Sequence, residues 1–185
     1  MRLRPLRADA ADVRAVLDAF TADPAEMSRQ GDVTDPDSAR AYVERLLRPT
    51  MRTAVIADPQ DRLLGLIGVS IDADHRLGWV FYWLHPAHRG AGLMSRAVRE
   101  VADHALAPEP EGWGLERLEL GHRANNPASG AVARAAGFVL EGRERGKFLV
   151  AGERIDVLTY GRLRSDPAPD AERLGPAPGV ERLDA

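Results

Sequence analysis

The stretch that decides the fold is residues 84–94, which read Leu84-His85-Pro86-Ala87-His88-Arg89-Gly90-Ala91-Gly92-Leu93-Met94. It follows an apolar run, 77–84, that predicts a β-strand, and it precedes apolar residues at helical spacing from Met94 to Ala105. A helix N-terminus offers unpartnered backbone N–H groups and a partial positive charge, and glycines let phosphate oxygens approach them. With Arg89 as a cation, the stretch predicts a cradle for a pyrophosphate.

Three other interpretations compete for this loop. A nucleoside-triphosphate loop ends in Gly-Lys-Ser or Gly-Lys-Thr, which is absent here. A dinucleotide-binding fold wants a third glycine near Ser95 and an acid after the next strand, whereas Glu109 and Glu111 lie in a proline-rich loop. The third interpretation is a tight strand-to-helix turn that binds no ligand.

Apolar spacing and turn signals predict an α/β fold around this loop. In chain order we expect a strand at 2–7, a helix capped by Asp9, a polar loop at 21–34, a helix capped by Asp35, strands at 53–57, 63–71 and 77–84, a helix at 94–105, a strand around 118–120, a helix capped by Asn126, and strands at 138–145 and 155–163. Apolar residues on both faces of the 77–84 strand indicate a central position that is covered on both sides.

Composition excludes several classes of function. The formal net charge of −3 provides no field to attract nucleic acid or an anionic membrane. The absence of cysteine excludes disulfides, thiolate metal sites and a covalent cysteine intermediate. The five histidines lack ligand-like spacing, so we expect no metal. Residues 1–5 lack the apolar core of a signal peptide, and no apolar run reaches the roughly 20 residues of a spanning helix. We therefore expect a cytoplasmic protein.

The last part of the chain differs in character. Residues 165–185 contain four prolines, two glycines and several charges. Such a segment has too little apolar surface to offset the entropy lost on ordering. We expect one domain at 1–164 and a mobile tail at 165–185, with a segment that orders on a partner subunit as the alternative.

Two segments resemble motifs of the GCN5-related N-acetyltransferase (GNAT) superfamily. Arg89-x-x-Gly92, between an apolar strand and an amphipathic helix, resembles motif A. The run from Asn125 to Phe138 resembles motif B of the branch that acetylates N-termini of ribosomal proteins. The resemblance covers residues 2–163 and implies a mixed, mostly antiparallel twisted sheet of about seven strands with helices on both faces, splayed between strands four and five.

The resemblance also implies an activity and its participants. Acetyl would pass directly from acetyl-coenzyme A, the co-substrate, to a primary amine of a protein N-terminus or a small molecule. A homodimer formed through the last strands is compatible with it. The residues expected to hold the coenzyme are Trp83, Leu84, His85, Arg89, Gly90, Ala91, Gly92, Leu93, Met94, Asn126 and Ser129. The superfamily usually has glycine or alanine where Met94 stands, so we expect looser packing on the pyrophosphate.

The reaction needs stabilisation of an oxyanion and protonation of the departing thiolate. By resemblance, a bulge in the 77–84 strand frees the N–H of Leu84 for the thioester carbonyl, whereas a normal strand would use that N–H in its ladder. Ser129, by resemblance, protonates or orients the thiolate, although a serine in a first helical turn is also a common capping residue. Asn126 serves as a helix cap, a pantetheine contact or both.

The base that accepts the amine proton stays open. The sequence offers Glu119, Tyr82, His75 and His122, and a chain of waters would need none of them. Glu119 also fits a solvated sheet position, and Tyr82 also fits simple packing. The resemblance implies a catalytic glutamate late in the chain, where this sequence has Lys147.

The polar loop at 21–34, by resemblance, walls the acceptor pocket with Glu26, Met27, Arg29 and Gln30. An acyl-coenzyme A sensor that lacks a base would share the cradle and is the leading alternative to an enzyme. A nucleotide-binding structural protein is the third class, and it predicts stabilisation by ATP or NAD.

Overall fold

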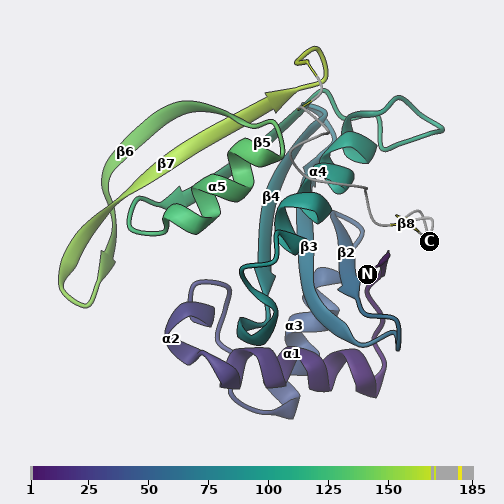
Figure 1. The fold of residues 1–185 in the computed structure, drawn as a ribbon, viewed down its shortest axis with the longest axis vertical. Coiled ribbons are helices and arrows are strands. Elements are labelled where there is room, and N and C mark those ends of the chain that lie inside the picture. Colours follow the sequence, from purple (N-terminus) through teal and green to yellow (C-terminus); the bar gives the residue numbers. More distant parts are fainter. Residues whose placement is uncertain (1, 168, 170–178, 181–185) are drawn as a thin grey trace.

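One mixed, mostly antiparallel β-sheet organises the chain in the computed structural model, which describes residues 2–167, 169, 179 and 180 (Figure 1). The strands are β1 (Arg2–Pro5), β2 (Met51–Ala57), β3 (Leu63–Asp72), β4 (Leu77–Leu84), β5 (Arg117–Arg123), β6 (Val139–Val150), β7 (Glu153–Leu163) and β8 (Gly179–Val180). Their order in the sheet is β6-β7-β5-β4-β3-β2-β1-β8. Among the strands that the structure describes, only the β4–β5 and β1–β8 pairs are parallel.

Helices cover both faces of this sheet (Figure 1). They are α1 (Ala10–Ala22), α2 (Pro24–Met27), α3 (Pro36–Leu46), α4 (Leu93–Leu106), α5 (Pro127–Ala135) and the 3-10 turn η1 (Pro86–His88). Helices α4 and α5 pack on one face, where Val80 and Leu84 of β4 join the core. Helices α1 and α3 pack on the other face, where Trp83 joins a second core. Strand β4 is therefore covered on both sides, and the expected fold class is confirmed.

Local sequence signals set most helix starts. The Asp9 carboxylate accepts the N–H groups of Ala11 and Asp12, and Asp35 forms a capping box with Ser38. The polar loop expected at 21–34 contains a short helix, α2, because Pro24 opens it and Asp23 caps it. Strands β6 and β7 extend further toward their shared turn than their apolar residues indicated.

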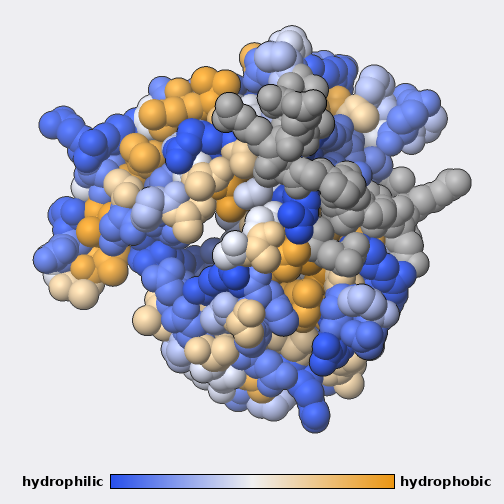
Figure 2. All heavy atoms as spheres, viewed as in Figure 1, coloured by the Kyte–Doolittle hydropathy of each residue, from blue (hydrophilic) through white to orange (hydrophobic). Residues whose placement is uncertain are grey.

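The sheet opens between β4 and β5. Their pairing covers only Leu77 to Trp79 against Arg117 to Glu119, although β4 continues to Leu84. The strands then diverge, and the space-filling view is hollowed between the α1–α2 end and the part that carries α5, β6 and β7 (Figure 2). The splay expected between strands four and five is confirmed.

The β6–β7 hairpin extends from the body as a long arm (Figure 1). Strand β6 is a sheet edge, and it exposes Val139, Leu140, Phe148 and Leu149 by 44–63% of their surface. Apolar side chains in such a position are typical of a surface that meets another chain.

A buried ion pair joins β1 to α1. The Arg4 guanidinium donates to both carboxylate oxygens of Asp12 at 2.6 and 2.8 Å, and the two residues are 1% and 2% exposed. Asp61 then binds Arg2, Arg4 and Arg7 at 2.6–2.7 Å from the side of the β2–β3 turn. The first strand is thus fixed to the rest of the sheet by charge as well as by its ladder.

Most of the expected tail at 165–185 lies outside the described residues. Gly179 and Val180, which are described, pair with β1. Among the described helices, none has both the length and the apolar character needed to cross a membrane.

Candidate active site

A cleft of about 420 Å³ opens where β4 and β5 separate. Its walls come from β4, the following loop, the starts of α4 and α5, and α2. The sequence-predicted residues that line it are Tyr82, Trp83, Leu84, Arg89, Gly90, Gly92, Leu93, Met94, Asn126 and Ser129. Glu26, Met27, Arg29 and Gln30 of the polar loop line it as well. His85, Ala91 and Glu119 are not part of this lining.

The backbone of Leu84 faces this cleft. The N–H of His85 donates to Leu64 O at 2.8 Å, across the β3–β4 pair. Because backbone groups alternate in direction along a strand, the N–H and C=O of Leu84 point away from β3. Its carbonyl accepts from Arg89 Nε at 3.2 Å rather than from a strand. The Leu84 N–H therefore points into the gap that β5 leaves.

The bulge expected in this strand is wrong. The β3–β4 register is continuous, from Asp72 opposite Leu77 to Gly65 opposite Leu84. The donor is exposed for a different reason: β5 turns away after Glu119 and leaves the β4 edge unpaired.

The start of α4 forms an open cradle. Gly92 caps the helix at φ 69° with no side-chain hydrogen bond, and Gly90 has φ 86°. A Cβ added at Gly90 would meet nothing within 4 Å, so the space above the loop is free. Uncapped helical N–H groups next to free space fit a bound diphosphate.

Two arginines lie near this cradle: Arg89, which the sequence indicated and which lines the cleft, and Arg96. Arg89 is held by Leu84 O and by Asp23, whose carboxylate lies 2.9 Å from Nη1. Arg96 Nη1 instead lies 3.5 Å from the Cβ position of Gly92. Side chains in a helix point back toward its N-terminus, so a residue four positions after the cap lies over the first turn. That rule could have found Arg96 from the sequence.

Tyr82 and Ser129 meet across the cleft. The Tyr82 hydroxyl lies 2.9 Å from Ser129 Oγ and donates to Ser129 O at 3.0 Å. Asn126 Oδ1 accepts the Ser129 N–H at 3.2 Å, which fixes the first turn of α5. Burial raises the pKa of Tyr82 to about 12. The phenol is therefore protonated at neutral pH, where it can donate a proton but cannot act as a base.

The remaining predicted coenzyme residues have structural contacts. His85 Nδ1 accepts the N–H of Ala87 at 3.2 Å and caps η1, and burial lowers the pKa of His85. Trp83 Nε1 donates to the Tyr42 hydroxyl at 3.1 Å within the second core. Met94 is 7% exposed and packs into the first core while it borders the cleft. Ala91 is exposed between the two glycines.

Glu119 lies at the closed end of the splay, opposite Trp79, rather than in the cleft. Its carboxylate accepts from Arg117 Nε at 2.8 Å, and Arg117 also pairs with Glu141. The strand pairing that closes the sheet there keeps Glu119 away from the open part.

The two histidines considered as bases are also occupied elsewhere. His75 lies 3.1 Å from Asp72 in the exposed β3–β4 turn. His122 stacks on Tyr160, with ring centroids 5.4 Å apart. Among the described residues that line the cleft, Glu26 is the one carboxylate.

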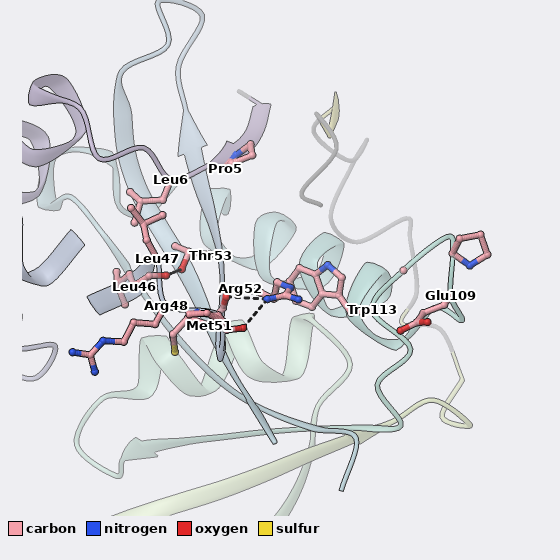
Figure 3. A pocket seen from close by; sticks show the side chains of 13 residues that line it. Pro5, Leu6, Leu46, Leu47, Arg48, Met51, Arg52, Thr53, Glu109 and Trp113 are labelled. Atoms are coloured by element: carbon pink, nitrogen blue, oxygen red, sulfur yellow. Dashed lines mark hydrogen bonds between the residues drawn. The ribbon is translucent and has the colours of Figure 1, made fainter. Parts of the chain in front are cut away.

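A second cavity, of about 610 Å³, opens beside the end of α3 and the 107–114 loop (Figure 3). None of the residues that the sequence singled out for chemistry lines it. Within the described part of the chain, no group of three or more His, Cys, Asp or Glu is placed to hold a metal ion.

Comparison with known proteins gives consistent matches. A family profile described as an acetyltransferase (GNAT) domain matches residues 1–139. The ribosomal-protein-serine acetyltransferase of Escherichia coli (strain K12) is 30% identical over 105 residues, which are 56% of each protein. The probable N-acetyltransferase YjcK of Bacillus subtilis (strain 168) is 30% identical over 128 residues, 68% of each protein. The matched part of the chain thus spans about half of the first relative's length.

A solved structure extends the match over most of the fold. RimL, a ribosomal L7/L12 alpha-N-protein acetyltransferase in complex with coenzyme A, is similar with a TM-score of 0.75 at 23% identity. The similarity covers 87% of this chain and 92% of that one.

Proposed function

The chain belongs to the GNAT acetyltransferase family, and on this premise we propose that it transfers the acetyl group of acetyl-coenzyme A to a primary amine by direct attack in a ternary complex. The acceptor is a protein N-terminus or a small molecule. The observation that carries this proposal is the open β4 edge at Leu84, which shares one cleft with the uncapped start of α4 and the Tyr82–Ser129 pair.

Acetyl-coenzyme A, when bound, supplies an activated thioester. The glycine loop and the first N–H groups of α4 would hold its diphosphate, with Arg96 as the nearby cation. The neighbouring β4 edge would hold the pantetheine arm, because its backbone groups have no strand opposite them.

The chain's own groups then divide the chemistry. The Leu84 N–H donates to the carbonyl oxygen on which negative charge develops. The protonated Tyr82 hydroxyl and Ser129 Oγ supply a proton for the departing sulfur. Glu26 accepts the proton of the incoming amine, because it is the one carboxylate among the described lining residues. A water chain is the alternative base, and an unchanged kcat in Glu26→Gln would favour it.

The test is release of free thiol from acetyl-coenzyme A in the presence of a panel of N-terminal peptides and small amines. We expect turnover with at least one acceptor, and heat of binding for coenzyme A in calorimetry. Thermal stabilisation by acetyl-coenzyme A without turnover on any acceptor would identify the sensor instead. Absence of any coenzyme binding would refute both.

The assembly and location of the protein stay predictions. The exposed apolar side chains of β6 support a homodimer through the arm. The C-terminal tail and the cytoplasmic location rest on composition alone.

A further inference from the structure

A third hollow adjoins the active-site cleft at the loop that follows α2. Its volume is about 360 Å³, and it shares Arg29 and Gln30 with the cleft. Gln30 stands at the junction, since its Nε2 donates to Tyr82 O at 3.3 Å on the open edge of β4. An acceptor whose amine reaches the cleft can therefore extend into this hollow.

The hollow is positively charged. Three arginines, Arg29, Arg45 and Arg48, line it, and its described lining contains no carboxylate. Arg45 lies over the Tyr42 ring at 4.9 Å, which leaves its guanidinium edge exposed. Arg48 is exposed and lies between this hollow and the larger cavity, with its side chain pointing away from Trp113 (Figure 3).

Arg29 has unused hydrogen-bonding capacity. Its Nη2 pairs with Glu26 at 2.7 Å, but its buried Nε has no partner among the described residues. Buried donors in folded proteins are nearly always satisfied, so this nitrogen is available to a ligand or to water. Arg123, at the end of β5, adds to the positive field: burial and the nearby charge of Arg29 lower the pKa of Arg123.

Aromatic surface lies between these cations. Trp79 and Phe81 alternate with Val80 along β4, so they share the sheet face that carries the hollow. Trp79 is 39% exposed, which is unusual for a tryptophan in a central strand. An aromatic surface bordered by guanidinium groups suits an extended peptide with acidic side chains.

We propose that the acceptor is the N-terminus of a polypeptide whose next residues are acidic, and that Arg29, Arg45 and Arg48 select it. This inference rests on the proposed acetyl transfer and names its substrate class. Because the arginines extend from the α2 loop to the end of α3, they match a row of carboxylates rather than a single one. A polyamine would meet like charge in this hollow and should be a poorer acceptor.

The first experiment compares three peptides that share an N-terminal serine and differ at the next three residues, Asp-Glu-Asp, Asn-Gln-Asn or Lys-Lys-Lys, with spermidine as a fourth acceptor. We expect kcat/KM to be roughly tenfold higher for the acidic than for the neutral peptide, and lower again for the basic one. The preference should weaken as salt rises, since exposed charges are screened.

The second experiment links the preference to the residues. The double variant Arg45→Gln/Arg48→Gln removes two exposed cations, so it should fold, and we expect it to lose most of the acidic-to-neutral ratio. Arg40→Gln is the matched control, because Arg40 is also exposed on α3 but does not line the hollow. Anisotropy of the labelled acidic peptide on the coenzyme A-bound protein should show the same loss without any turnover.

The outcomes separate the two proposals. Turnover of the neutral peptide without an acidic preference, or an equal preference in the double variant, would overturn the acidic acceptor and leave acetyl transfer intact. No turnover with any peptide or amine would remove the proposed function itself, and the acceptor assignment with it.

Discussion

Tyr82 and Ser129 form one hydrogen-bonded unit, so a substitution at either residue should affect the same step. Each hydroxyl is the other's partner at 2.9 Å, and burial holds the Tyr82 phenol in its protonated form. The sequence alone suggested Ser129 as an acid and left Tyr82 among the bases. It could not reveal the pairing, because the two residues come from elements 47 positions apart.

Ser129→Ala and Tyr82→Phe should each lower kcat by about 10- to 100-fold, because each removes a proton donor near the sulfur. The KM for acetyl-coenzyme A should change by less than about threefold, since the cradle at α4 is untouched. The double variant should be little worse than either single one, as expected of a coupled pair. Steady-state kinetics measures all three, and unchanged turnover in Ser129→Ala would remove that residue from the mechanism.

At the scale of elements, the α4 start is where sequence reasoning was most successful. A strand, a two-glycine loop and a helical stripe sufficed to predict the strand, open loop and helix start found there, because these depend on backbone and adjacent residues. Asp9, Asp35 and Asn126 likewise cap the helices expected of them. The features that the sequence did not reveal depend on distant partners. Arg89 forms an ion pair with Asp23, and the edge of β4 at Leu84 is open because β5 pairs with β4 only as far as Glu119.

Gly90→Ala tests the cradle against a matched control. Gly90 and Gly152 have φ of 86° and 85°, and neither has an atom within 4 Å of an added Cβ. Both substitutions should cost about 1 kcal/mol of stability from left-handed backbone strain. Only Gly90→Ala should also weaken coenzyme A binding, by about tenfold, because its methyl group enters the space for phosphate. Calorimetry checks this, and equal affinities in both variants would contradict a diphosphate at this loop.

At the scale of the whole molecule, charge fixes the first strand. Arg4→Ala should lower the free energy of unfolding by about 3–5 kcal/mol, because it leaves the Asp12 carboxylate buried without its partner. Arg4→Met combined with Asp12→Leu should recover much of this loss, since an apolar pair avoids the desolvation cost. Arg62→Ala, which removes an exposed ion pair with Asp58, should have a small effect. Urea unfolding compares them, and no recovery in the double variant would contradict the explanation.

Asp61 should make this stability depend on pH. Hydrogen bonds from Arg7 and Arg2 hold the pKa of Asp61 well below its ordinary value of 3.8. Stabilisation by a carboxylate with a lowered pKa is fully present above that ordinary value and is lost as pH falls toward the folded-state pKa. Asp61→Asn should therefore destabilise the protein at pH 5–8, and its difference from the wild type should shrink below about pH 4. A difference that is constant down to pH 3 would refute this.

The short β4–β5 pairing has a mechanical consequence. Strand pairing between one half of the sheet, β1 to β4, and the other half, β5 to β7, involves just three described residues on each strand. A coenzyme bound along the unpaired edge of β4 would contact both halves and hold them together. Amide hydrogen exchange at 80–84 and 120–123 should then slow on addition of coenzyme A, while exchange in the β6–β7 arm should not change. The co-substrate is therefore expected to stabilise the sheet as well as to supply the acetyl group.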